Sequence, residues 1–130
     1  MFVDASAWTA ILLNEPERAE LRARLAAADI VLTSAVATWE TVRALARATH
    51  PVGEAFATVT SLQAGFGALV VSIGEKEQGL AVEAHARFGK GVHPAKLNMG
   101  DCFAYACAKA HGVPLLYKGG DFALTDIEAA

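Results

Sequence analysis

Four acidic residues lie far apart in this sequence, yet a parallel α/β fold would bring all of them to one edge. They are Asp4, Glu40, Asp101 and Asp121. Two carboxylates about 4 Å apart repel each other by roughly 4 kcal/mol at an effective dielectric constant near 20. A cluster of them must therefore take up protons or bind a hard cation such as Mg²⁺ or Mn²⁺. The four positions predict a divalent-cation site.

The expected order of secondary structure explains why the four acids should meet. Strands and helices alternate, which predicts an α/β fold with a parallel sheet covered on both faces. Strand ends and the starts of the following helices share one edge of such a sheet, where ligands bind. The strands are expected at 1–4, 29–33, 68–72 and 113–117, and the helices at 5–13, 17–28, 35–49, 54–64, 76–88 and 101–111.

Each acid has a definite place in this scheme. Asp4 and Asp121 follow strands, and Asp101 begins a helix. Glu40 lies about five residues into its helix, but helical side chains lean toward the helix N-terminus and so toward the shared edge. The apolar run 68–72 predicts a strand buried on both faces of the sheet. The tail offers one more short strand near Ile127.

Structural roles are the alternative interpretation of these acids. Asp4, Asp101 and Asp121 could each cap a helix or a turn, which is worth roughly 1 kcal/mol. Glu40 could pair with Arg43 on the same helix. Capping does not explain why acids occur at several separate elements of the same edge, so we favour the cation site.

Composition limits the other possibilities. With 130 residues, the chain is expected to form one domain, residues 1–130. No apolar run approaches the roughly 20 residues of a membrane span, and the N-terminus does not resemble a secretory signal. We therefore expect a cytoplasmic protein without a membrane partner. The net charge of -3 gives no overall attraction to nucleic acid, so a polyanionic substrate would need local bases and a bound cation.

Other candidate residues have ordinary interpretations. Cys102 and Cys107 lie on one expected helix and are interpreted as buried small hydrophobic residues, because their spacing suits neither a disulfide nor zinc. Trp8 and Trp39 are expected to pack in the core. Lys118 is a candidate contact for a phosphate, with a solvated strand end as the alternative. Neither a phosphate-binding loop nor a dinucleotide fingerprint occurs.

The acids also carry a resemblance to a known family. The matching segments are 1–7, 34–40, 97–106, 115–122 and 124–127, and they span almost the whole chain in the expected order. The most specific is Asn-x-Gly-Asp-Cys-x-x-Tyr-Ala, which begins at Asn98. The chain resembles PIN-domain proteins, most closely VapC-type toxins of bacterial toxin–antitoxin pairs. This resemblance implies a three-layer α/β/α fold with a mostly parallel sheet of four to five strands.

The resemblance also implies roles for the acids. Asp4, Glu40, Asp101 and Asp121 would be catalytic. The metal ligands would be Asp4, Asp101 and Asp121, with Glu40 either touching the metal or orienting water. Ser6 and Asn98 would support the site.

One position departs from the family pattern. Gly120 stands where similar toxins often carry an acidic or polar residue. That departure leaves open whether Asp121 or Asp126 completes the site. We favour Asp121, because it directly follows the expected strand.

The function implied by the resemblance is endonucleolytic cleavage of RNA by water activated by Mg²⁺ or Mn²⁺. The implied partners are an RNA substrate, a VapB-like antitoxin, and a second copy of the chain that pairs through helices of the N-terminal half. Two alternatives remain. One is a PIN-type nuclease that acts on DNA or structured nucleic acid, and the other is a non-catalytic binding module with a degenerate acidic site.

Overall fold

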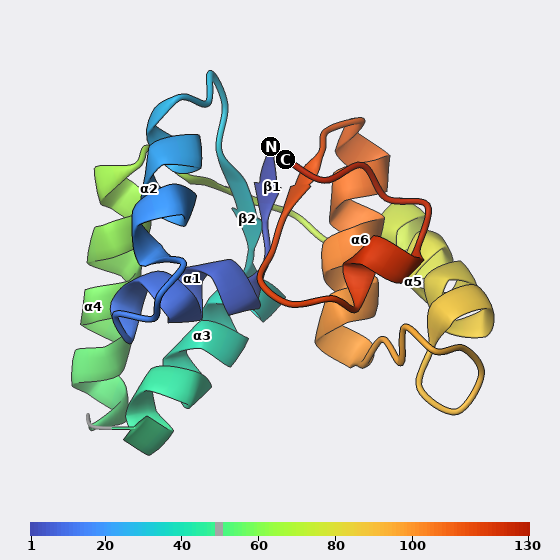
Figure 1. Cartoon of the computed structure of the whole chain (residues 1–130), viewed down its shortest axis with the longest axis horizontal. Coiled ribbons are helices and arrows are strands. Elements are labelled where there is room, and N and C mark those ends of the chain that lie inside the picture. Colours follow the sequence, from blue (N-terminus) through green and yellow to red (C-terminus); the bar gives the residue numbers. More distant parts are fainter. Residues whose placement is uncertain (49–50) are drawn as a thin grey trace.

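The computed structural model describes residues 1–48 and 51–130, and the expected end of the third helix at Thr49 and His50 lies outside the described residues. Strands and helices alternate as the sequence predicts (Figure 1). The elements are β1 (Phe2–Val3), α1 (Ala5–Leu12), α2 (Arg18–Ala26), β2 (Leu32–Ser34), α3 (Ala35–Ala48), α4 (Val52–Gly65), β3 (Leu69–Val71), α5 (Glu75–Phe88), α6 (Met99–His111), β4 (Leu115–Leu116) and the short 3₁₀ helix η1 (Phe122–Leu124).

The sheet has four strands in the order β3-β2-β1-β4, and all of its pairs are parallel. Helices α1 to α4 lie on one side of the sheet, and α5 and α6 lie on the other (Figure 1). The predicted three-layer α/β fold is therefore confirmed.

Strands β1 and β4 are buried on both faces. Successive side chains along a strand point in opposite directions, so each of these strands contributes to two cores. Phe2 of β1 and Leu115 of β4 belong to the core cluster that includes α5 and α6. Their neighbours Val3 and Leu116 belong to the cluster that includes α1 and α2. Strands β1 and β4 thus contribute side chains to both cores, and this packing holds the ends of the two strands in place.

Strand β3 differs from the prediction that it is buried on both faces. Leu69 and Val70 are each 61% exposed. The strand pairs only with β2, at one edge of the sheet. The prediction was wrong because an apolar run identifies a strand but not its place in the strand order. The expected tail strand near Ile127 is also absent from the described residues, where Ala129 instead forms an isolated bridge with Leu115.

The predictions for cysteine and tryptophan fare differently. Both cysteines are buried and free, as expected. Trp8 is fully buried, whereas Trp39 is 52% exposed and carries the Arg43 guanidinium 4.7 Å from its ring centre. The prediction that Trp39 packs in the core was therefore wrong. No helix of the described chain is both long enough and apolar enough to cross a membrane.

Candidate active site

Asp4 is held rigidly at the end of β1. Its backbone N–H donates to the Leu116 carbonyl at 2.9 Å, and the residue is the N-cap of α1. The Ser6 backbone N–H and the Ser6 hydroxyl donate to Asp4 Oδ2 at 2.8 and 2.5 Å. Asp4 is only 3% exposed. Ser6 therefore fixes one carboxylate oxygen and leaves Oδ1 for another partner.

Asp101 is placed by a capping box at the start of α6. The helix begins at Met99, two residues earlier than predicted, because Asn98 caps it. The Asn98 N–H donates to Asp101 Oδ2 at 2.8 Å, and the Asp101 N–H donates to Asn98 Oδ1 at 3.1 Å. This reciprocal pairing satisfies two backbone donors that a helix start leaves open. Asp101 thus has a structural role, and its Oδ1 remains available.

One open cavity of about 310 Å³ joins these groups. We call it the acidic cavity. It receives Asp4 and Ser6 from the end of β1 and the start of α1, Glu40 from α3, and Asn98 and Asp101 from the start of α6. The complete lining is Asp4, Ala5, Ser6, Thr9, Glu15, Glu40, Ala44, Asn98, Asp101 and Lys118.

The pKa values of Asp4, Glu40 and Asp101 are all raised. Burial raises the pKa of Asp4, and its hydrogen bonds from Ser6 only partly oppose this. Burial and then the charges of Asp4 and Asp101 raise the pKa of Glu40 to about 7. Burial and the charges of Asp4 and Asp121 raise the pKa of Asp101 to about 6. The acids therefore face one another across poorly solvated space.

Asp121 and Asp126 have different surroundings. Asp121 is exposed and does not line the cavity, but its charge acts on Asp101, so it lies on the same side of the molecule. The Tyr105 hydroxyl donates to Asp126 at 2.6 Å, and Arg87 pairs with its other oxygen at 3.0 Å. Because Asp126 already has these partners, whereas the charge of Asp121 acts on Asp101, the arrangement favours Asp121 as the additional acid.

Lys118 reaches the rim of the acidic cavity, but its charge is engaged there. Its backbone N–H donates to Ser6 Oγ at 3.0 Å. Its ammonium pairs with Glu15, and Glu17 lies 3.5 Å away. Glu15, in the segment between α1 and α2, is a cavity residue that the sequence analysis missed. A substrate phosphate would have to compete with these two carboxylates for Lys118.

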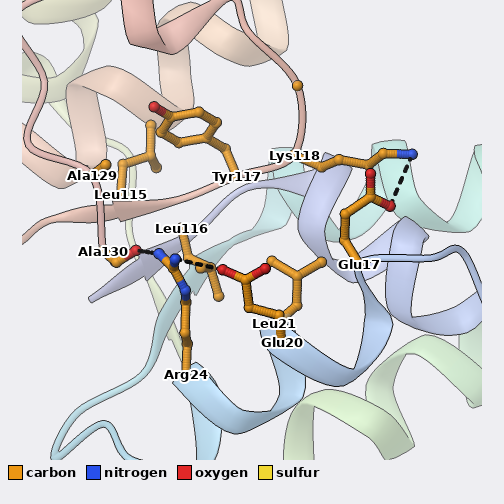
Figure 2. Close-up of a pocket in the computed structure, with 11 residues that line it drawn as sticks. Glu17, Glu20, Leu21, Arg24, Leu115, Leu116, Tyr117, Lys118, Ala129 and Ala130 are labelled. Carbon is orange, nitrogen blue, oxygen red and sulfur yellow. Dashed lines mark hydrogen bonds and ion pairs between the residues drawn. The ribbon is translucent and has the colours of Figure 1, made fainter.

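A second cavity, of about 220 Å³, lies between α2, β4 and the C-terminal residues (Figure 2). Its charged residues neutralise one another. Arg24 contacts Glu20 at 2.6 Å and also the Ala130 carbonyl, and Lys118 lies near Glu17 (Figure 2). The acidic cavity is the better candidate for chemistry, because Asp4, Glu40 and Asp101 have no ion pair among the described residues.

The donor set of the acidic cavity suits a hard divalent cation. Asp4 and Asp101 each keep one carboxylate oxygen without a hydrogen bond from the described residues. Among those residues, no three candidate ligands already lie close enough together to hold an ion. Mg²⁺ is commonly bound by one or two protein carboxylates and keeps several waters. Two fixed aspartates with Glu40 beside them fit that pattern, and a third protein ligand requires a side-chain movement.

Comparison with known proteins places the chain in a family. The sequence model of the PIN domain matches residues 1–128. The chain belongs to the PIN-domain family. A VapC ribonuclease of Rhizobium meliloti is 42% identical, over 97% of this chain and 98% of the relative. Ribonuclease VapC of Mycolicibacterium smegmatis is 40% identical, over 99% of this chain and 98% of the relative.

A solved structure shares the PIN fold. The crystal structure of Mycobacterium tuberculosis VapC20, a Sarcin-Ricin loop cleaving toxin, matches 99% of this chain and 97% of its own with a TM-score of 0.77. The sequence identity is 19%, so this match concerns the fold. The four-stranded parallel sheet and its two layers of helices are therefore those of a VapC-type PIN domain.

Proposed function

We propose that this PIN-domain chain is a metal-dependent endoribonuclease and the toxin of a toxin–antitoxin pair, built as a single domain of residues 1–130. The observation that carries the proposal is the acidic cavity, where burial raises the pKa of Asp4, Glu40 and Asp101, and none of the three has an ion pair among the described residues. The full-length relatives named as ribonucleases support RNA as the substrate.

The proposed ligands of Mg²⁺ or Mn²⁺ are Asp4 and Asp101, with Asp121 as a third. A divalent cation held there would lower the pKa of a bound water and would offset charge on the phosphodiester in the transition state. Ser6 keeps the Asp4 carboxylate in one orientation, and Asn98 does the same for Asp101. Glu40, which lies across the cavity, accepts a hydrogen bond from the attacking water and so orients it toward phosphorus.

The test is a cleavage assay with purified protein and matched RNA and DNA oligonucleotides. We expect RNA cleavage with Mg²⁺ or Mn²⁺ and none with EDTA. The Asp4→Asn variant, which keeps the shape of the side chain but removes its charge, should be inactive while its circular dichroism spectrum stays unchanged. Preferred cleavage of DNA supports the alternative substrate. Absence of both cleavage and Mn²⁺ binding supports a non-catalytic module.

The expected partners are part of the same proposal. Exposed Val52 and Phe56 lie one turn apart on α4, in the N-terminal half, and provide an apolar face for a second copy of the chain. An apolar groove between α5 and α6 includes Val82, Met99 and Phe103. We assign this groove to a VapB-like antitoxin, since Met99 of the groove directly follows Asn98 of the acidic cavity in the sequence and a basic side chain of the antitoxin could reach the acids from there.

Both partner assignments and the cytoplasmic location follow from the proposed toxin function. Light scattering at micromolar concentrations should give twice the chain mass. A monomer throughout that range would contradict the homodimer.

A further inference from the structure

We infer that Gly100 is a positioning residue for Glu40, because the Glu40 carboxylate occupies the space that a side chain at position 100 would need. The inference rests on the proposed function for its meaning, but the contact itself is a feature of the fold. It concerns the residue directly before Asp101 in the most specific segment of the sequence.

The steric relation is unusually tight. A Cβ atom built on Gly100 would lie 2.0 Å from Glu40 Oε2, 2.2 Å from Oε1 and 2.3 Å from Cδ. Ordinary contact begins at 3.4 Å. The carboxylate group of Glu40 therefore lies directly on the first turn of α6. Even the longest of the three separations, 2.3 Å, is more than 1 Å shorter than an ordinary contact of 3.4 Å, so a side chain at position 100 would displace the carboxylate by more than 1 Å.

Backbone conformation does not explain the glycine. Gly100 lies inside α6, after the Asn98 cap, and it is not among the glycines with positive φ. A helix interior favours alanine over glycine. The three atoms nearest to a Cβ at this position all belong to the Glu40 carboxylate, which is the flexible end of a long side chain. Alanine at position 100 should therefore leave the fold intact and move Glu40.

The consequence for the acidic cavity is specific. Glu40 comes from α3, and no hydrogen bond within residues 1–48 and 51–130 fixes its carboxylate. Its position beside Asp4 and Asp101 depends instead on the space that Gly100 leaves open. Gly100 thus couples the α3 acid to the α6 acid, and it acts through Glu40 rather than on substrate.

The decisive experiment compares Gly100→Ala with a matched control, Gly79→Ala. Gly79 also lies within a helix, but a Cβ there meets nothing within 4 Å. We expect both variants to melt at or above the wild-type temperature. Only Gly100→Ala should lose RNA cleavage, by roughly 10- to 100-fold, the range seen when a group that orients an active-site residue is lost. A crystal structure of Gly100→Ala should show the Glu40 carboxylate displaced from its wild-type position.

A second background separates a positioning role from a general disturbance of α6. Glu40→Asp shortens the side chain by one carbon–carbon bond, roughly 1.5 Å, which relieves the overlap. In that background Gly100→Ala should cause no further loss of cleavage or of Mn²⁺ affinity measured by calorimetry. Equal losses in both backgrounds, or an undisplaced Glu40 in the crystal, would overturn the inference.

Failure of the function and failure of this inference are distinguishable. If the wild-type chain does not cleave RNA, the proposed function fails. The position of Glu40 in the Gly100→Ala crystal and the Mn²⁺ titrations still decide whether Gly100 positions Glu40.

Discussion

Two groups of carboxylates in this molecule have opposite electrostatic settings. Asp126 is surrounded by Tyr105, Arg87 and Lys109, and these partners lower its pKa, the Tyr105 hydrogen bond most of all. In the acidic cavity, by contrast, burial raises the pKa of Asp4, Glu40 and Asp101, and neighbouring carboxylates raise the pKa of Glu40 and Asp101 further. The carboxylate of Asp126 links the C-terminal tail to α5 and α6, whereas the carboxylates of the acidic cavity lie close together without ion pairs among the described residues.

The contrast shows which acids the fold needs for its own stability. Asp126 joins residues from α5 and α6 to the tail, so removing its charge should weaken the fold. Asp4, Glu40 and Asp101 oppose folding at neutral pH because burial disfavours their charged forms, and neighbouring carboxylates add repulsion at Glu40 and Asp101. Groups that a protein keeps at a cost in stability are candidates for function.

The largest expected effect separates Asp101 from Asp126. Asp101→Asn should reduce Mg²⁺-dependent RNA cleavage by more than about 100-fold, since it removes a proposed metal ligand. Asp126→Asn should leave cleavage within about 2-fold of wild type, and it should lower the free energy of unfolding by about 1 kcal/mol, the value of a partly exposed ion-pair network. Cleavage rates and urea unfolding curves measure the two properties.

If Asp126→Asn abolished cleavage and Asp101→Asn did not, the assignment of the two clusters would be reversed. Loss of cleavage in both variants with unchanged stability would place Asp126 in the site, the alternative that the sequence left open.

A smaller effect concerns pH. Raised pKa values mean that the folded protein binds protons more tightly than the unfolded chain, so the stability they confer is present at low pH and is lost as pH rises through the folded pKa values. Those values are about 6 for Asp101 and about 7 for Glu40. In EDTA, the melting temperature should therefore fall between pH 5 and pH 8. The fall should correspond to on the order of 1 kcal/mol, because Glu40 is partly solvated.

Two additions sharpen the pH experiment. Mn²⁺ at pH 8 should restore the melting temperature, since an ion that binds only the folded state stabilises it. Glu40→Gln should flatten the pH dependence. A metal-free melting temperature that rises from pH 5 to pH 8 would show that folding does not raise the pKa values of Glu40 and Asp101.

The smallest effect is expected at Lys118, which lies between the two settings. Its ammonium pairs with Glu15 and Glu17, which raises its pKa, the Glu15 hydrogen bond most of all. Lys118→Ala should raise KM for RNA only a few-fold, because those carboxylates already engage the charge. Salt should reduce the difference, since exposed charges are screened over about 10 Å at 0.1 M. A change confined to kcat would argue against a phosphate contact.

Much of the fold was accessible from local patterns. The order of strands and helices follows from apolar runs separated by polar turns, and the short strands at Phe2 and Leu115 were recognised because both lie in apolar runs. Errors arose where burial depends on distant neighbours. Leu69 looked like a central strand residue, and Trp39 looked like a core residue, but both are largely exposed. A local sequence pattern predicts neither the order of the strands in the sheet nor which side of α3 faces the solvent.

The sequence by itself determined the kinds of residue at the site and their approximate meeting place, because parallel strands end at one edge and helices that follow them begin there. Only the tertiary structure decided which side chains contact these residues. It paired Asp126 with Arg87 and Lys109, engaged Lys118 with Glu15, and laid Glu40 against Gly100. The physical reason is that a side chain's charge state and position depend on neighbours from other elements, and those neighbours are brought together only when the chain packs.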